Sequence, residues 1–410
     1  MPLPLYLLAV AVFAMGTSEF MLAGLLPDIA SDLDVTVGTA AMLTSAFAIG
    51  MTVGAPLMAG IARDRPARSG LLGCVLVFSA SHAVGAATSS YPLLLATRVT
   101  SALANAGFLA VALTTAAALV PSDKKGRALS VLLSGTTVAT IAGVPAGSAL
   151  GAQLGWRAVF WAVAALCLPA AAGILAGIPA RRAERDVAGG PALRSELAQL
   201  RSPRLLLVML LGALVNAATF GSFTFLAPVV TDTAGLGELW IPVVLVLFGA
   251  GSLVGVTVAG RLSDQRPGLV IAAGGPLLLL GWPALAMLAE EPIALLVLAF
   301  VQGALSFALG GTLITRVLYE AAGAPTMAGS YATAALNVGA AVGPVIAATT
   351  LTTAVADLGP LWASGALVAV ALLIAFPLRA VVAGPKRRDA PVTRANAPVN
   401  VEGRRNPVEH

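Results

Sequence analysis

Long apolar stretches alternate with short polar connections along most of this 410-residue chain. A helix needs about 20 apolar residues to cross the roughly 30 Å hydrocarbon core of a bilayer. The pattern therefore predicts an all-α, polytopic membrane protein with twelve transmembrane helices. The predicted spans are residues 4–26, 38–62, 69–89, 92–119, 128–153, 157–179, 204–230, 239–262, 268–289, 292–318, 326–355 and 358–382.

A repeat with a period of about 200 residues is visible within the sequence. Gly60 and Asp64, in the loop after the second span, have counterparts 200 positions later, among them Asp264. The stretch Gly143-Val-Pro145-Ala-Gly147 in the fifth span is followed, 200 positions on, by another Gly-Pro in the eleventh. Displacements that agree in this way predict two pseudo-symmetric six-helix bundles related by an axis along the membrane normal.

The longest polar connection falls between the sixth and seventh spans. We therefore predict an N-terminal bundle over residues 1–179, a cytoplasmic linker over 180–203 and a C-terminal bundle over 204–383. Within the linker, Leu193 to Leu200 reads as one surface helix. Residues 384–410 are polar and rich in proline, which predicts a disordered cytoplasmic tail.

Composition and charge support a membrane protein and set its orientation. Apolar residues make up 58% of the chain and charged ones 10%, whereas an ordinary soluble domain carries roughly 25% charged residues. Lysine and arginine gather in the even-numbered connections and the tail, and acidic residues in the odd-numbered ones. Both termini are therefore predicted to be cytoplasmic in a multi-pass protein of the cell membrane. Because the basic residues lie in loops, the net charge of +5 does not indicate a nucleic-acid partner.

Glu19, in the first span, is the one acidic residue in the membrane interior, and Arg98, in the fourth, is the one basic residue well inside a span. A charge near the bilayer centre costs about 2.5–3.5 kcal/mol, so such residues are functional candidates. We expect Glu19 to exchange protons and Arg98 to be its electrostatic partner at a similar depth. The alternatives are a protonated Glu19 that hydrogen-bonds within the bundle and an Arg98 that binds helix carbonyl groups.

Glycines spaced four apart occur in the second, fifth, eighth and eleventh spans, for example Gly50 and Gly54. Such spacing allows close approach of helix backbones. We expect the second span to pack on the eleventh and the fifth on the eighth, with the glycines at the seam between bundles. The alternative is ordinary packing inside each bundle. If the second span packs on the eleventh, Asp64 would face the positive N-terminal end of the eleventh and latch the cytoplasmic side.

Polar and aromatic residues within the spans are candidates for a substrate cavity, although aromatic residues that merely pack between helices are an equal alternative. His82 in the third span reads as a neutral core residue rather than a proton relay. No nucleotide-binding or metal-binding pattern occurs, so no cofactor or metal and no enzymatic activity are expected. The cavity candidates are Phe20, Asn105, Phe108, Asn216, Phe220, Tyr331 and Asn337.

The loop Gly60-x-x-x-Asp64-Arg65-x-x-Arg68 resembles the signature that follows the second helix in the major facilitator superfamily. Gly143-Val-Pro145-Ala-Gly147 is similar to the helix 5 motif of that superfamily's antiporters, and Arg98 is placed like the basic residue of its drug:proton antiporters. Stretches from Gly16 to Ala30 and from Asn105 to Thr114 look like actinobacterial chloramphenicol-resistance exporters.

The resemblance implies a monomeric, proton-driven exporter of amphenicol-like drugs, with Glu19 as the protonatable group and Arg98 as its partner. It also implies a conformational latch formed by the loop residues and Asp264. A proton-coupled exporter of a sugar or nucleoside metabolite remains the alternative on the same fold. A channel or a membrane-embedded enzyme is the alternative of a different class.

Overall fold

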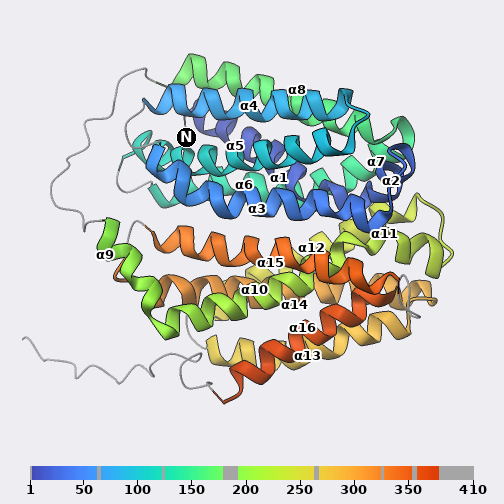
Figure 1. Ribbon diagram of the computed structural model, residues 1–410. Coiled ribbons are helices and arrows are strands. Elements are labelled where there is room, and N and C mark those ends of the chain that lie inside the picture. The colour runs from blue at the N-terminus through green and yellow to red at the C-terminus, as the bar shows by residue number, and fades with distance from the viewer. Residues whose placement is uncertain are drawn as a thin grey trace, which may run out of the picture.

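The structure is a computed structural model, and every element of secondary structure in the part that it describes is helical (Figure 1). This confirms the predicted all-α fold. The described residues are 2–61, 66–121, 125–178, 193–262, 267–324, 327–352 and 358–377.

The helices form two bundles that lie side by side in Figure 1. Those of the first bundle are α1 (Leu3–Phe20), α2 (Leu26–Asp32), α3 (Val37–Ile61), α4 (Ala67–Ala87), α5 (Tyr91–Ala118), α6 (Lys125–Val138), α7 (Val144–Leu154) and α8 (Trp156–Gly177). Those of the second are α10 (Pro203–Thr224), α11 (Leu226–Pro228), α12 (Trp240–Leu262), α13 (Pro267–Met287), α14 (Pro292–Glu320), α15 (Ala328–Thr350) and α16 (Gly359–Ala375). In the linker, α9 (Leu193–Leu197) and a 3-10 turn (Ala198–Arg201) match the predicted surface helix.

Ten helical segments of the described chain are long and apolar enough to cross a membrane. An eleventh, α16, is apolar and slightly shorter. The twelfth is a continuous helical path from Lys125 to Leu154, in which α6 and α7 are joined by a π-helical turn, Ala139–Gly143. These twelve segments correspond to the twelve predicted spans.

Proline interrupts the first span of each bundle at equivalent points. Pro27 lacks an N–H group and its ring excludes a regular bond to the carbonyl of Ala23, and α1 ends at Phe20 before a 3-10 turn. Pro228, 201 positions later, bears the same relation to Thr224, where α10 ends. The π-helical turn contains Ile141, the residue four positions before Pro145, whose carbonyl likewise cannot bond to a proline nitrogen. Irregular backbone therefore lies within three of the spans.

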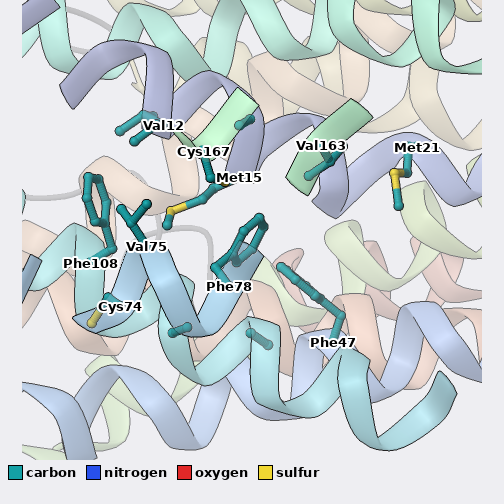
Figure 2. Packing of buried hydrophobic residues seen from close by; sticks show 14 of the residues in the cluster. Val12, Met15, Met21, Phe47, Cys74, Val75, Phe78, Phe108, Val163 and Cys167 are labelled. Carbon is teal, nitrogen blue, oxygen red and sulfur yellow. The ribbon is translucent and has the colours of Figure 1, made fainter. Parts of the chain in front are cut away.

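Each bundle has its own apolar core, and the same helix pairs pack in both. In the first bundle α1 packs on α6 and α8, α4 on α5 and α8, and α3 on α5. The second bundle repeats this as α10 on α15 and α16, α13 on α14 and α16, and α12 on α14. Figure 2 shows part of the first core, where Met15, Val75 and Phe78 pack together. The recurrence of every pair agrees with the predicted duplication.

The seam between the bundles is formed by the helices that the sequence predicted. Helix α3 packs on α15, and α12 packs on α7 and on the π-helical turn. The glycines expected there are placed elsewhere. A Cβ added at Gly50 would meet Ala102 and Val99 of α5, and one at Gly255 would meet Ala304 of α14.

The glycines of the fifth and eleventh spans behave in the same way. Gly143 faces Thr17 and Phe13 of α1, and Gly343 faces Ala217 of α10. The prediction of a glycine seam was therefore wrong. These glycines instead allow helices of the same bundle to approach each other closely.

Candidate functional site

Glu19 lies at the junction of the two bundles, next to the end of α1. Its partly buried side chain lines a narrow space together with residues from α1, α3 and α10 and from the 3-10 turn that follows α1. Among the described residues, no hydrogen bond or ion pair holds its carboxylate. The irregular backbone that begins at Met21 prevents α1 from continuing past this side chain. The other lining residues are Phe20, Ala23, Thr44, Phe220, Phe223 and Thr224.

Aromatic rings from both bundles form one wall of this space. The rings of Phe20 and Phe220 have centroids 5.6 Å apart, and those of Phe20 and Phe223 6.4 Å apart. Phe223 in turn lies 4.9 Å from Phe248 of α12. Two of the predicted cavity residues, Phe20 and Phe220, are therefore brought together beside Glu19. The sequence prediction omitted Thr44 and Thr224, because threonine is common in membrane helices and carries no signal of its own.

Arg98 is fully inside the first bundle and binds the residue that precedes Glu19. Its Nη1 donates to Ser18 Oγ at 2.8 Å and its Nη2 donates to the Ser18 carbonyl at 2.9 Å. The guanidinium also lies over the ring of Phe47, 4.5 Å from the centroid. Cation–π contacts of this kind help to hold a buried charge. Arg98 is thus anchored to α1 immediately beside Glu19.

No ion pair between Arg98 and Glu19 is present among the described residues. Arg98 instead donates a hydrogen bond to the carbonyl of Ser18, the residue before Glu19, so its role as the electrostatic partner of Glu19 stays a prediction. Ser18 was missed by the sequence prediction. Its position in the polar run Gly16-Thr17-Ser18-Glu19, inside an apolar span, was the available signal.

His82 of α4 belongs to the same network. Its Nε2 is 2.6 Å from Ser18 Oγ and its Nδ1 is 2.8 Å from the Phe78 carbonyl. The imidazole is 2% exposed and lies 4.3 Å, between centroids, from the Phe78 ring. The expectation of a hydrogen-bonded core histidine is confirmed as far as its contacts and burial go.

Two predicted cavity residues lie away from Glu19. Phe108 is completely buried in the first core, beside Val75 in Figure 2. Tyr331 is buried in the second core, and its hydroxyl donates to the Glu196 carbonyl at 2.9 Å. The structure therefore assigns both to packing.

The three asparagines differ in the hydrogen bonds that their side chains make. Asn216 Nδ2 donates to the Leu336 carbonyl at 2.7 Å and so joins α10 to α15. Asn337 Nδ2 donates at 3.0 Å to the Thr333 carbonyl in its own helix. Asn105 is 2% exposed, and its Oδ1 has no partner within the described structure. None of the three lines the space around Glu19.

The motif residues of the loops and of helix 5 are partly described. Asp64, Arg65 and Asp264 lie outside the described residues, so the proposed latch stays a prediction. Gly60 is near the end of α3, and Arg68 is the second residue of α4. The helix 5 motif surrounds the end of the π-helical turn; its residues are Gly143, Pro145 and Gly147.

An acidic residue that the sequence did not single out occupies the N-terminal end of α15. Glu196 of the linker is 1% exposed, and its Oε2 accepts a hydrogen bond from the Met327 backbone N–H at 2.9 Å. A carboxylate at that position complements the positive end of the helix. The linker is thereby docked on the second bundle.

Comparison with known proteins identifies the family. Residues 8–334 match the model of the Major Facilitator Superfamily. The chain belongs to this superfamily. Among its relatives, a protein of Streptomyces lividans named "Chloramphenicol resistance protein" is 76% identical over 95% of this chain and 100% of its own length. The inner membrane transport protein YdhP of Escherichia coli K12 is 32% identical over 83% of this chain and 86% of its own length.

Solved structures of the superfamily share the fold of this chain. A bacterial homologue of the human lysosomal transporter Spinster, crystallised in an inward-facing, unoccupied conformation, aligns with a TM-score of 0.73 at 16% identity. The alignment covers 93% of this chain and 96% of that one. The likeness supports the arrangement of two six-helix bundles.

Proposed function

We propose that this major facilitator protein exports chloramphenicol-like amphenicols from the cytoplasm and takes up protons in exchange. The 76% identity to a chloramphenicol resistance protein, over that protein's entire length, supports the substrate class. The basic connections support an orientation in which α9 and both termini are cytoplasmic. A monomer suffices, because the candidate cavity lies between the chain's own bundles.

The lining of the space around Glu19 is the observation that carries the proposal. An amphenicol has an aromatic ring, hydroxyl groups and an amide, and no net charge. Phenyl rings and threonine hydroxyls are the groups that such a molecule needs, and both are present around the carboxylate. A sugar would instead require several hydrogen-bonding side chains. The lining therefore favours an aromatic drug over a sugar metabolite.

The size of the space agrees with a transporter between two open states. Pockets for drug-sized ligands measure about 300–1,000 Å³, whereas the space beside Glu19 has no room for even a water-sized molecule. Binding of the drug therefore requires the bundles to separate along the seam. In the proposed cycle this separation alternates between the two faces of the membrane. The two open states expose Glu19 to different sides.

Glu19 supplies the coupling in this scheme. A proton taken from outside neutralises the carboxylate, and its release inside restores the charge. Arg98 stays hydrogen-bonded to Ser18 throughout and keeps a positive charge beside the carboxylate. The loop of Gly60, Asp64, Arg65 and Arg68 would hold the cytoplasmic side closed while the outer side is open.

The test is transport by Glu19→Gln in proteoliposomes with an imposed pH gradient. Glutamine keeps the size of the side chain but cannot exchange a proton, so gradient-driven chloramphenicol uptake should fall to background. Glu290→Gln, an exposed acid outside the membrane helices, is the matched control and should transport as the wild type does. Full gradient-driven uptake by Glu19→Gln would remove Glu19 from the mechanism.

A further inference from the structure

The hydrogen bonds of His82 have a direction that the geometry fixes. The Phe78 carbonyl can only accept, so Nδ1 of His82 must carry the hydrogen of their 2.8 Å bond. In the neutral imidazole Nε2 is then an acceptor, and the Ser18 hydroxyl, 2.6 Å away, donates to it. A lone pair of the same hydroxyl oxygen accepts from Arg98 Nη1 at 2.8 Å. Arg98, Ser18 and His82 thus form one directed chain.

All three members of this chain are buried, and they come from α5, α1 and α4. Ser18 is completely inaccessible and Arg98 is 1% exposed. The His82 ring lies 5.6 Å, between centroids, from the uncharged ring of Phe160 in α8. Among these three hydrogen-bonded residues, Arg98 is the one that carries a charge. Glu19 directly follows Ser18 in the sequence. The network therefore ends at the residue that precedes Glu19 in α1.

We propose that His82 is a positioning residue for proton coupling, which orients the Ser18 hydroxyl and through it holds the Arg98 guanidinium on α1 beside Glu19. This inference rests on the proposed role of Glu19. It assigns no proton transfer to His82 itself. Its function is to keep the charge of Arg98 close to the carboxylate without a direct ion pair.

Arg98 has a hydrogen-bond donor to spare, which is why its guanidinium needs to be held in place. Its Nε is buried and has no hydrogen-bond partner within the described structure. Hydrogen bonds between arginine and a carboxylate are among the strongest in proteins, so free rotation of this guanidinium would favour a direct pair with Glu19. A direct pair with Glu19 would hold the carboxylate ionised and stop its proton exchange. Two anchors on Ser18, one oriented by His82, prevent that rotation.

Loss of the His82 acceptor would release one of these anchors. The Ser18 hydroxyl would then rotate to donate to a carbonyl one turn earlier in α1, as serine commonly does in helices. Its lone pairs would no longer point at Arg98. Loss of such a hydrogen bond to a charged group should slow transport about tenfold, which corresponds to about 1.4 kcal/mol.

The experiment compares His82→Phe with His82→Gln in the full-length protein. Phenylalanine keeps the aromatic packing between Phe78 and Phe160 but has no acceptor, whereas glutamine offers a carbonyl oxygen. Three quantities are measured: chloramphenicol binding, proton release on drug binding in weakly buffered detergent, and gradient-driven uptake. We expect His82→Phe to bind chloramphenicol within about twofold of wild type, to release fewer protons and to transport about tenfold more slowly. We expect His82→Gln to recover most of the loss.

Ser18→Ala provides a second, independent variant in case His82→Phe does not fold. It removes the middle of the chain with little change of volume and should give the same defect. The double variant His82→Phe/Ser18→Ala should transport no more slowly than either single variant, because both substitutions interrupt the same series of hydrogen bonds. A merely structural role would instead lower binding, proton release and thermal stability together.

The outcomes separate this inference from the proposed function. If Glu19→Gln is inactive while His82→Phe and Ser18→Ala release protons and transport like wild type, the inference is overturned and the function stands. If Glu19→Gln transports normally, both fall. A defect in His82→Phe that glutamine leaves unchanged, with Ser18→Ala normal, also rejects the hydrogen-bonded chain.

Discussion

Gly249 gives the sharpest test of how the two bundles separate. It lies in α12 and faces the π-helical turn across the seam, where an added Cβ would sit 2.6 Å from the Thr140 carbonyl oxygen and 3.4 Å from Ile141 Cα. Both neighbours are backbone atoms, so they cannot turn aside as a flexible side chain would. Gly249→Ala therefore forces the bundles apart at this point.

The size of the effect follows from that distance. Cβ contacts below 3.4 Å are rare, so the seam must open by about 0.8 Å, the difference between 3.4 and 2.6 Å. Overpacking of this kind costs about 1–3 kcal/mol. Because the cost falls only on the conformation with this seam closed, it changes the conformational equilibrium by about 5- to 150-fold.

The assay is the distance between spin labels on the two bundles at the end where α7 and α12 meet. Leu154→Cys and Leu239→Cys are suitable positions, since their side chains are 70% and 71% exposed, and the two buried native cysteines are first replaced. Gly249→Ala should raise the population with the longer distance. Gly251→Ala is the control, because its Cβ would meet the Phe300 backbone inside the second bundle.

We expect the two variants to fail differently. Gly251→Ala should lower thermal stability and leave the distance distribution unchanged, because α12 and α14 belong to one bundle. Gly249→Ala should retain most of its stability and shift the distribution. An unshifted distribution in Gly249→Ala, or an equal shift in Gly251→Ala, would refute the assignment of the seam.

Two further predictions concern contacts at the ends of the membrane helices. The hydrogen bond from Arg157 holds the pKa of Asp32 below its ordinary value, so Asp32→Asn should lower stability at pH 7 by at most about 1 kcal/mol. That difference should vanish as pH falls through the depressed pKa of Asp32; a difference that persists in acid would contradict the ion pair. Glu196→Ala removes the bond to the Met327 N–H and should speed tryptic cleavage of the linker several-fold, with a smaller effect for Tyr331→Phe. Equal cleavage rates in all three proteins would show that this docking does not protect the linker.

The sequence by itself determined the class of the protein and its main architecture. The apolar length of each span can be read directly from the sequence, because the bilayer thickness sets it. The displacement of Gly60 and Asp64 by about 200 residues can be read in the same way, because it reflects the internal repeat. Glu19 could also be found from sequence, because a carboxyl group within an apolar span is costly wherever the helix lies.

Only the tertiary structure decided which groups meet. Gly50 and Gly255 show small-residue spacing, but spacing does not say which neighbouring helix a face meets, and both proved to lie within a bundle. Arg98 reaches the Ser18 carbonyl, and His82 reaches the Ser18 hydroxyl, across 80 and 64 positions of sequence. Contacts of that range depend on the rotation of each helix about its axis, which is set by packing against all its neighbours at once.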